Sequence, residues 1–326
     1  MKKLVSIVIP VFNESGPLLP LLNKLYEVFS DAYRYEVIFV DDGSTDDTLA
    51  QLRRFSTEDN RVFYISFSRN FGHQNALKAG LDNAKGDCVI SLDGDLQHPP
   101  ALITNMLDVW EQDYDIVYTR RSDNKRLSTF IRVTSRLYAP ILKFFSGMPI
   151  EQGVADFRLL DRKVVNVLLH FQESEIFLRG AIYWIGFRKK AIDYAPEPRF
   201  SGNTKYSTAK MLQLAVKGIT SFSVKPLYVS VFLGSLFVFI SILYLGYVLW
   251  RVAADQAVAG WASTIFCIVF IGGINLFMLG IIGIYISKIF IQTKFRPSYI
   301  IRDTNLDCNT PPTTSASGWG WGRGTQ

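Results

Sequence analysis

Two aspartates one residue apart, Asp93 and Asp95, are the strongest candidates for chemistry in this chain. They follow the apolar run at residues 88–90, which is typical of a buried parallel strand, so both carboxylates are expected at a strand's carboxyl end. Gly94 between them would let a diphosphate approach the main chain closely. Carboxylate oxygens suit Mg²⁺ or Mn²⁺, which complete their shell with water and substrate phosphates. An Asp-Gly-Asp by itself also occurs as a solvated turn or a helix cap.

Acidic residues recur after two other predicted strands. Glu14 follows an apolar strand at residues 4–9. The pair Asp41 and Asp42 follows a strand at residues 37–40. The carboxyl ends of parallel strands meet at one edge of a sheet, which is where open α/β sheets bind ligands. One shared site is therefore favoured over three separate helix caps.

The elements that must position these residues alternate between strands and helices. Strands are expected at residues 4–9, 37–40, 62–67, 88–90 and 116–118. Helices are expected at residues 18–28 and after residues 46, 72 and 99, the second of them capped by Thr45 or Asp46. This alternation predicts an α/β domain with a mostly parallel sheet and helices on both faces. Neither the dinucleotide signature G-x-G-x-x-G nor the phosphate loop G-x-x-x-x-G-K-[ST] is present, so the sequence gives no support to a dehydrogenase or a P-loop enzyme.

The composition indicates that part of the chain sits in a bilayer. Of the 326 residues 48% are hydrophobic, and the mean hydropathy is +0.15, which is high for a soluble protein. The net charge of +6 suits anionic lipid, a phosphorylated substrate or nucleic acid, without choosing among them. The three cysteines show neither metal spacing nor an obvious pairing, which favours a reducing compartment.

Residues 227–250 and 261–287 contain no charged side chain, and each stretch is long enough to span a bilayer. Lysines and arginines gather before the first stretch and after the second, whereas the link between them carries only Arg251 and Asp255. By the positive-inside rule, the preceding domain and both termini are expected in the cytoplasm, at the cell inner membrane.

The chain is therefore expected to have four parts. They are a catalytic domain at residues 1–200, a loop and juxtamembrane amphipathic helix at 201–225, two transmembrane helices at 226–290, and a C-terminal segment at 291–326. From Asp303 onward this last segment is polar and then rich in Pro, Thr, Ser and Gly, so a disordered tail is expected there. Two spans per chain also leave room for packing between the protomers of a homo-oligomer.

Cationic residues follow the acidic ones. Arg120 and Arg121 follow the strand at residues 116–118, and Arg132, Arg136 and Lys143 recur with helical spacing beside an apolar face. An amphipathic helix of this kind can lie on a membrane surface, although a basic stripe can also be an ordinary solvated face.

Five motifs then occur in a fixed order. They are VIPVFNE at residues 8–14, VDDGSTD at 40–46, SRNFG at 68–72, LDGDLQHPP at 92–100 and ADFRLLDR at 155–162. Together they resemble the family 2 glycosyltransferases of the GT-A fold, and specifically the polyprenyl-phosphate glycosyltransferases. That group includes dolichol-phosphate mannose synthase and the bactoprenol glucosyltransferases. The resemblance covers about residues 4–300.

The resemblance implies a UDP-sugar donor, with glucose as the default sugar, and polyprenyl (undecaprenyl) phosphate as the acceptor. The product would serve cell-envelope or O-antigen glycan modification, and no nucleic-acid partner is expected. The donor would be bound by Pro10, Phe12, Glu14, Asp41, Asp42, Asp93, Gly94, Arg120 and Lys205. The metal, Mg²⁺ or Mn²⁺, would be held by Asp93, Asp95 and Gln97. The acceptor phosphate would be bound by Arg132, Ser135 and Arg136, and the catalytic residues would be Asp156, Asp95 and Arg132.

Asp156 matches the family position of a catalytic base, but the chemistry leaves two roles open. A phosphate monoester has a second pKa of about 6, so the acceptor is already largely dianionic at pH 7. Such a nucleophile hardly needs a base, and the harder task is to bring two anionic substrates together. Asp156 is therefore either a base or a residue that positions the sugar or a cation.

Two other classes of protein share parts of this pattern. A processive polysaccharide synthase has the same sheet and acidic motifs, but typically more membrane spans and a Q-x-x-R-W motif, which this sequence lacks. A non-catalytic nucleotide-binding scaffold would be expected to have a damaged site, whereas Asp42, Asp93, Asp95 and Asp156 are all present.

Overall fold

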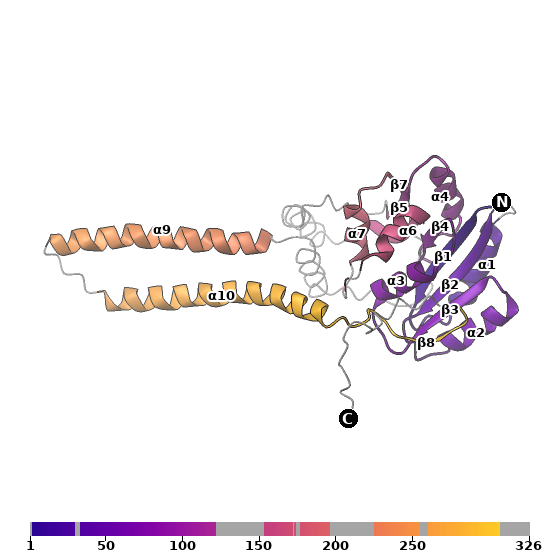
Figure 1. Cartoon of the computed structure of the whole chain (residues 1–326), viewed down its shortest axis with the longest axis horizontal. Helices are drawn as coiled ribbons and strands as arrows, with labels where there is room; N and C mark the ends of the chain where they lie inside the picture. Colours follow the sequence, from indigo (N-terminus) through magenta and orange to yellow (C-terminus); the bar gives the residue numbers. More distant parts are fainter. Residues whose placement is uncertain are drawn as a thin grey trace, which may run out of the picture. The chain divides into compact units, whose positions relative to one another are not determined.

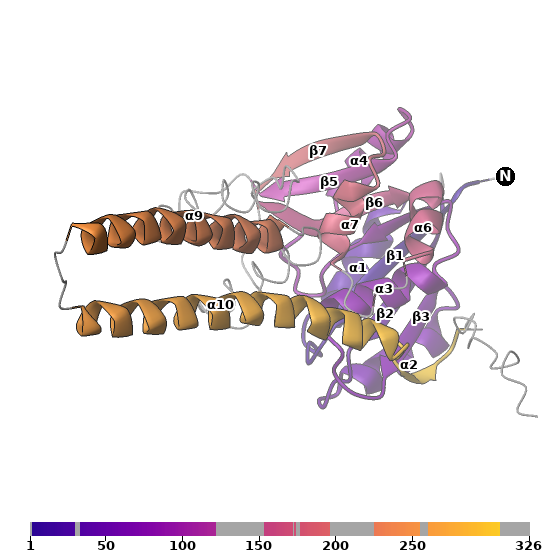
Figure 2. The same ribbon diagram turned by 60° about the vertical axis from the view of Figure 1, so that its left-hand side comes forward.

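The structure is a computed structural model that describes residues 2–29, 33–121, 153–171, 173, 177–195, 225–254 and 260–306. The described residues fall into two compact units. The first combines those up to residue 121 with 153–195 and 297–306, and the second contains 225–254 and 260–296. Figure 1 and Figure 2 show the elements of each unit in two views.

The first unit is built on one mixed sheet of eight strands in the order β7-β5-β6-β4-β1-β2-β3-β8. The strands are β1 Leu4–Val11, β2 Arg34–Asp41, β3 Val62–Phe67, β4 Cys88–Ser91, β5 Ile116–Arg121, β6 Val154–Asp161, β7 Lys189–Tyr194 and β8 Ile301–Thr304. The block β4-β1-β2-β3 is parallel, as is the pair β5 and β7, whereas β6 and β8 run antiparallel to their neighbours. The α/β prediction is thus confirmed, with a parallel centre inside a mixed sheet.

Helices cover both faces of this sheet. They are α1 Leu18–Val28, α2 Thr48–Glu58, α3 His73–Asn83, α4 Leu102–Trp110, α6 Arg162–Leu169 and α7 Leu178–Trp184. One core cluster joins α1, α2 and α4 to the sheet, and the other joins α3, α6 and α7 to it. The strands of the parallel block are buried on both faces, which explains why their sequences are continuous apolar runs.

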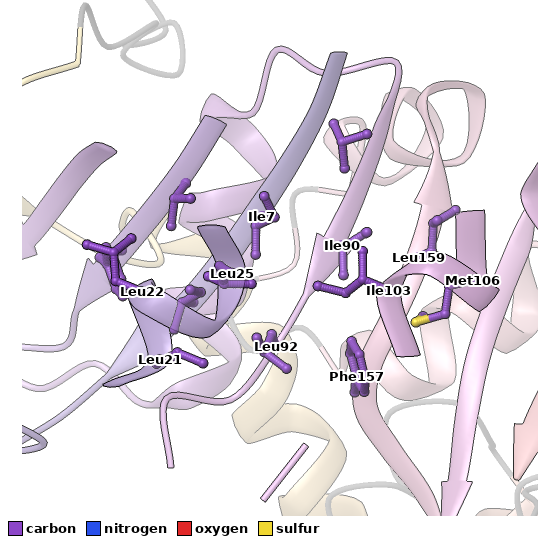
Figure 3. Close-up of a cluster of buried hydrophobic side chains, with 14 of the residues drawn as sticks. Ile7, Leu21, Leu22, Leu25, Ile90, Leu92, Ile103, Met106, Phe157 and Leu159 are labelled. Carbon is purple, nitrogen blue, oxygen red and sulfur yellow. The ribbon is translucent and has the colours of Figure 1, made fainter. Parts of the chain in front are cut away.

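The first of these clusters shows how helical periodicity becomes packing (Figure 3). Leu21, Leu22 and Leu25 of α1 recur at helical spacing and lie against Ile7 of β1. On the same face, Ile103 and Met106 of α4 lie over β4 and β6 (Figure 3). Burying one such side chain contributes about 1.5 to 3 kcal/mol to folding, so this face anchors the strands that end at the candidate site.

Several element boundaries differ from the expectation. Helix α2 begins at Thr48 with Asp47 at its N-cap, not with Thr45 or Asp46. Asp46 nevertheless contributes, because its Oδ1 accepts a hydrogen bond from the backbone N–H of Thr48 at 3.0 Å. The expected start of a disordered tail at Asp303 is wrong, since Asp303 and Thr304 pair with β3. A four-residue edge strand of mostly polar residues has too little apolar pattern to be recognised in sequence.

The second unit consists of two long helices, α9 Lys225–Ala253 and α10 Trp261–Thr293. At about 1.5 Å per residue both exceed the roughly 30 Å hydrocarbon core of a bilayer. Their apolar windows, Leu227–Tyr244 and Phe270–Thr293, are long and apolar enough to cross a membrane, by length and composition only. The rings of Phe237 and Phe270 lie 5.6 Å apart, so the two helices contact each other (Figures 1 and 2).

Candidate active site

The sheet brings the acidic motifs to one edge. Strands β1, β2, β3 and β4 are parallel and end there, and β6, being antiparallel to β4, begins there. The pairing of Ser91 with Arg158 places Asp156 next to the loop that carries Asp93. A hydrogen bond from Ser91 Oγ to the carbonyl oxygen of Asp156 fixes this contact. The proximity of Asp93 and Asp156 therefore follows from strand register.

Asp156 is a buried carboxylate held by two guanidinium groups. Its Oδ1 accepts hydrogen bonds from Arg158 Nη2 at 2.9 Å and Arg179 Nε at 2.8 Å, and its Oδ2 accepts one from Arg179 Nη2 at 2.7 Å. Burial alone would raise the pKa of Asp156, but hydrogen bonds with His73 and Arg179 and the charge of Arg158 hold that pKa well below its usual range. Asp156 is thus a weakly basic anion that gathers cations.

Asp93 has one engaged oxygen and one without a hydrogen bond. Oδ2 lies 3.0 Å from His98 Nε2, whereas Oδ1 is buried and accepts no hydrogen bond from any described residue. His73 Nε2 lies 3.5 Å from Oδ1 and also 3.5 Å from Asp156 Oδ2. Burial favours the neutral carboxyl, but the hydrogen bond with His98 and the charge of His73 lower the pKa of Asp93. An ionised Oδ1 without a hydrogen bond is the atom best suited to receive a ligand.

His73 is the first residue of α3 and lies between these two carboxylates. Burial would lower its pKa, yet the hydrogen bond with Asp156 and the charge of Asp93 raise it. The imidazole therefore links the loop after β4 to β6 through charge.

A hydrogen-bonded network holds Asp93 from the other side. His98 is fully buried, and its Nδ1 forms a hydrogen bond with the hydroxyl of Tyr194 at 2.7 Å. Arg121 donates from Nε to the same hydroxyl at 3.2 Å and from Nη2 to Gln97 Oε1 at 3.1 Å. Because partners of this kind fix the orientation of a ligating side chain, the network positions Asp93.

The turn between Asp93 and Gln97 has a specific backbone shape. A Cβ atom at Gly94 would lie 2.7 Å from Glu14 Oε2 and 2.8 Å from Val11 Cγ1, so any larger residue would displace these two side chains. Leu96 adopts a left-handed conformation with φ of 60°, which is costly for a bulky residue and typical of functional turns. Asp95 Oδ1 accepts a hydrogen bond from the backbone N–H of Gln97 at 3.1 Å. The close fit at Gly94 brings Glu14 to this turn, as the sequence predicts.

Asp41 and Asp42 have mostly backbone partners. Asp41 Oδ1 accepts from the N–H of Ser44 at 2.9 Å. Asp42 accepts from the N–H groups of Phe71 at 2.7 Å and Gly72 at 3.0 Å, and burial raises the pKa of its carboxyl despite these bonds. Gly43, with φ of 72°, lets this turn approach the backbone of Arg69, where a Cβ would lie at 2.5 Å. These two carboxylates hold the turns around the site together.

The remaining predicted donor residues lie at the same edge or beside it. Pro10 is buried near the end of β1, and Phe12 just after it is 44% exposed. Arg120 forms an exposed ion pair with Asp193, at 2.6 Å, so the network around Asp93 contains its neighbour Arg121 instead. The predictions for Arg132, Ser135, Arg136 and Lys205 lie outside the described residues.

The carboxylate oxygens at the Asp93–Asp95 turn fit a hard divalent cation. Asp93 and Asp95 offer carboxylate oxygens on one turn, and Asp93 Oδ1 accepts no hydrogen bond from the described residues. In that part of the chain no group of three or more His, Cys, Asp or Glu side chains is arranged to hold a metal ion. Two protein ligands suit Mg²⁺ or Mn²⁺, which keep several waters and bind substrate phosphates. Gln97, the third predicted ligand, has its side-chain oxygen engaged by Arg121.

Sequence reasoning gave no role to five residues of this site: His73, His98, Arg158, Arg179 and Tyr194. Arg158 had a signal, because it lies two residues after Asp156 on the same strand and therefore on the same face. His73 had a weaker one, as the first helical residue after a strand that ends at the site edge. Arg179 and Tyr194 reach the site from α7 and β7, and neither lies in one of the five motifs.

Comparison with known proteins assigns the chain to a family. Residues 6–169 match the family described as Glycosyl transferase family 2. An uncharacterized glycosyltransferase, YkcC, of Bacillus subtilis is 40% identical over 91% of this chain and 93% of its own length. The bactoprenol glucosyl transferase of Shigella phage SfV is 36% identical over 92% of this chain and 98% of its own length.

One of the similar solved structures is a mannosyltransferase, PcManGT, from Pyrobaculum calidifontis in complex with GDP-Man and Mn²⁺. It is 20% identical, with a TM-score of 0.42 over 58% of this chain and 54% of that one. The family match and the extended similarity to full-length relatives decide the assignment, and they agree with the mixed α/β sheet and its acidic edge. The chain belongs to glycosyl transferase family 2, and it is a glycosyltransferase of the GT-A fold.

Proposed function

We propose that this glycosyltransferase moves a sugar from a UDP-sugar to polyprenyl phosphate, with glucose and undecaprenyl phosphate as the default substrates. The observation that carries this proposal is the meeting of Asp93, with its Oδ1 lacking a hydrogen bond, and Asp156, with its two arginines, at one sheet edge. Relatives named bactoprenol glucosyl transferase, 35–36% identical over 91–92% of the chain, support the acceptor and the sugar. The product would serve cell-envelope or O-antigen glycan modification.

Transfer in one displacement inverts the sugar. An oxygen of the acceptor phosphate forms a bond to C1, the bond from C1 to the diphosphate oxygen breaks, and UDP leaves. The acceptor is largely dianionic at pH 7 and needs no base. Because the pKa of Asp156 lies well below its usual range, Asp156 is also a poor base. We therefore assign Asp156 a positioning role.

That role is to hold Arg158 and Arg179 where two anionic substrates must meet. Arg179 lies with 42% of its side chain exposed, and Arg158 is buried beside it. Fixed guanidinium groups lower the cost of bringing a phosphate to a nucleotide-sugar, because they offset like charge without reorganising during the reaction. Arg158 and Arg179 would thus supply the positive charge that is needed to bring the two anionic substrates together.

Asp93 and Asp95, with Gln97, would hold Mg²⁺ or Mn²⁺ on the donor diphosphate. The bound cation would neutralise charge on the leaving group. His98 and Tyr194 keep the second oxygen of Asp93 occupied, which would leave Oδ1 to bind the cation.

The other assigned residues complete the two substrate sites. The base and ribose would be held by Pro10, Phe12 and Glu14, on loops that Asp41 and Asp42 keep in place. The diphosphate would be held by Gly94, Arg120 and Lys205, and the acceptor phosphate by Arg132, Ser135 and Arg136. The helices α9 and α10 would anchor the enzyme in the inner membrane, with both termini on the cytoplasmic side. This arrangement agrees with a cytosolic nucleotide-sugar and a lipid acceptor.

Incubation of the membrane-embedded protein with labelled UDP-sugars and polyprenyl phosphate tests the proposal. An organic-soluble, labelled lipid product, resolved by thin-layer chromatography across a panel of UDP-sugars, would support it and identify the sugar. A growing polymer would indicate a polysaccharide synthase instead. No lipid product with any nucleotide-sugar would indicate a non-catalytic scaffold.

A further inference from the structure

The segment that follows α10 returns to the first unit and completes the edge of its sheet (Figure 1). Strand β8 runs antiparallel to β3, with Ser66 opposite Asp303 and Phe67 opposite Ile301. The register shifts between these pairs, so Arg302 is the extra residue of a β-bulge. Bulges re-aim a side chain relative to regular strand alternation. Here the bulge brings the guanidinium of Arg302 to Ser66.

A chain of hydrogen bonds leads from Arg302 into the candidate site. Arg302 Nη2 donates to Ser66 Oγ at 3.3 Å, and Ser66 Oγ donates to Asp41 Oδ2 at 2.7 Å. One hydroxyl can accept and donate at once, so both bonds can exist together. Ser66 and Asp41 are fully buried, which strengthens the polarisation of this hydroxyl by the cation.

Asp41 connects Ser66 to the loops of the site through further hydrogen bonds. Its Oδ1 accepts from the backbone N–H of Ser44, and the hydroxyl of Ser44 accepts from the N–H of Asn13 at 2.9 Å. Asn13 Oδ1 in turn accepts from the N–H of Thr45 at 2.8 Å, and Asn13 holds a left-handed φ of 54°. These hydrogen bonds hold the turn after β2 against the loop after β1, and Phe12 is the neighbour of Asn13 in that loop.

The attachment of β8 does not depend on Arg302. Arg53 Nε donates to Asp303 Oδ2 at 2.9 Å, and the hydroxyl of Tyr64 also contacts that carboxylate, at 3.2 Å. Tyr299 stacks on Phe67 with ring centroids 5.2 Å apart. These contacts hold the strand to β3, so the loss of the Arg302 side chain would leave the strand in place.

We propose that Arg302 is a positioning residue for the donor nucleotide: through Ser66 it fixes Asp41 and the two loops that bind the nucleoside diphosphate. The inference rests on the proposed function, since it assigns those loops to the donor. It makes the segment beyond the two long helices part of the donor site.

The test is calorimetric titration of the full-length protein with UDP and Mn²⁺ in the absence of acceptor. Arg302→Gln should weaken UDP binding by about three- to tenfold, as expected when one hydrogen-bonded constraint is lost. The KM for the UDP-sugar should rise by the same factor, with the KM for polyprenyl phosphate and the melting temperature unchanged. Arg302→Lys should restore part of the affinity. Ser66→Ala should weaken UDP binding similarly, and the double variant no further, because both act through Asp41.

Arg53→Gln is the matched control, because it removes a cation that holds the same strand through Asp303 and, among the described residues, makes no hydrogen bond to Ser66 or Asp41. It should lower the melting temperature and leave UDP affinity unchanged. The inference is overturned if Arg302→Gln binds UDP like the unchanged protein, or if both variants lose affinity and stability in parallel. No UDP binding by the unchanged protein would overturn the proposed function together with this inference, whereas intact binding by Arg302→Gln overturns this inference alone.

Discussion

The two halves of the site edge use the same residue type in different ways. In the half formed by β2 and β3, Asp41 and Asp42 are buried and accept hydrogen bonds from backbone amides and a serine hydroxyl. In the half formed by β4 and β6, Asp93 and Asp156 face histidines and arginines, and Asp93 keeps one oxygen without a hydrogen bond. Aspartates at one sheet edge therefore divide between holding loops and meeting charged substrates.

The difference shows that the partners of a carboxylate, more than its place in a motif, indicate its role. A carboxylate satisfied by amides stabilises a turn, and its removal should reduce stability. When a carboxylate lies beside cations and keeps one oxygen without a hydrogen bond, its removal should mainly lower the turnover rate. Variants of the two halves should therefore separate in two measurements, the rate and the melting temperature.

Asp95→Asn should give the largest effect. Loss of a charged metal ligand should lower kcat by about three orders of magnitude, equivalent to about 4 kcal/mol of transition-state stabilisation, with the melting temperature unchanged. Turnover of labelled UDP-sugar and thermal unfolding measure the two quantities. Asp108→Asn, at an exposed position of α4, removes the same charge and should do nothing. Wild-type turnover in Asp95→Asn, or in excess EDTA, would contradict the metal assignment.

Asp156→Asn should lower turnover by about a hundredfold at every pH between 5 and 9. The folded pKa lies well below the usual value, so the group is ionised throughout this range. Its contribution to stability is present above the ordinary pKa near 4 and is lost only as the pH falls toward the folded pKa. The pH profile of kcat distinguishes a positioning residue from a base. Recovery of activity as the pH rises would show that Asp156 acts as a base.

Asp42→Asn should act mainly on stability. The substitution replaces Oδ2, which accepts from the N–H of Gly72, with an NH2 group that cannot accept a hydrogen bond and that faces the same N–H. We therefore expect a loss of about 1.5 to 3 kcal/mol in the free energy of unfolding. Thermal unfolding of the purified protein measures it. Asp47→Asn is the control, because Asp47 lies in the same loop and makes no capping bond. A large loss of turnover with unchanged stability would place Asp42 in the other class.

Tyr194→Phe should give the smallest effect. It removes the hydroxyl that holds His98 without touching Asp93, so Mn²⁺ affinity and kcat should each fall by about three- to tenfold. Electron paramagnetic resonance of free Mn²⁺ measures the affinity independently of activity. The control is Tyr33→Phe. Tyr33 comes directly before β2, and its hydroxyl contacts Glu111. Equal Mn²⁺ affinity in Tyr194→Phe and the unchanged protein would exclude the network from positioning Asp93.

Sequence reasoning located one class of site residue and missed another. Asp41, Asp42, Asp93 and Asp95 follow apolar runs, and the carboxyl ends of such strands share an edge, so periodicity and topology were enough. Arg179 lies 23 residues from Asp156 and reaches it from a helix on the sheet face, a relation that no local pattern encodes. Strand β8 was missed for the same reason, because its partner β3 is more than 230 residues away in sequence.

The late return of β8 has a consequence for synthesis of the chain. Strand β3 is made early, but within the described part of the chain its outer edge is paired by residues 301–304, which emerge after both α9 and α10. Until then the nascent domain presents an open strand edge, which is a template for pairing with other chains. A chain that stops within the long helices would leave the ribosome with its sheet unfinished and prone to aggregation.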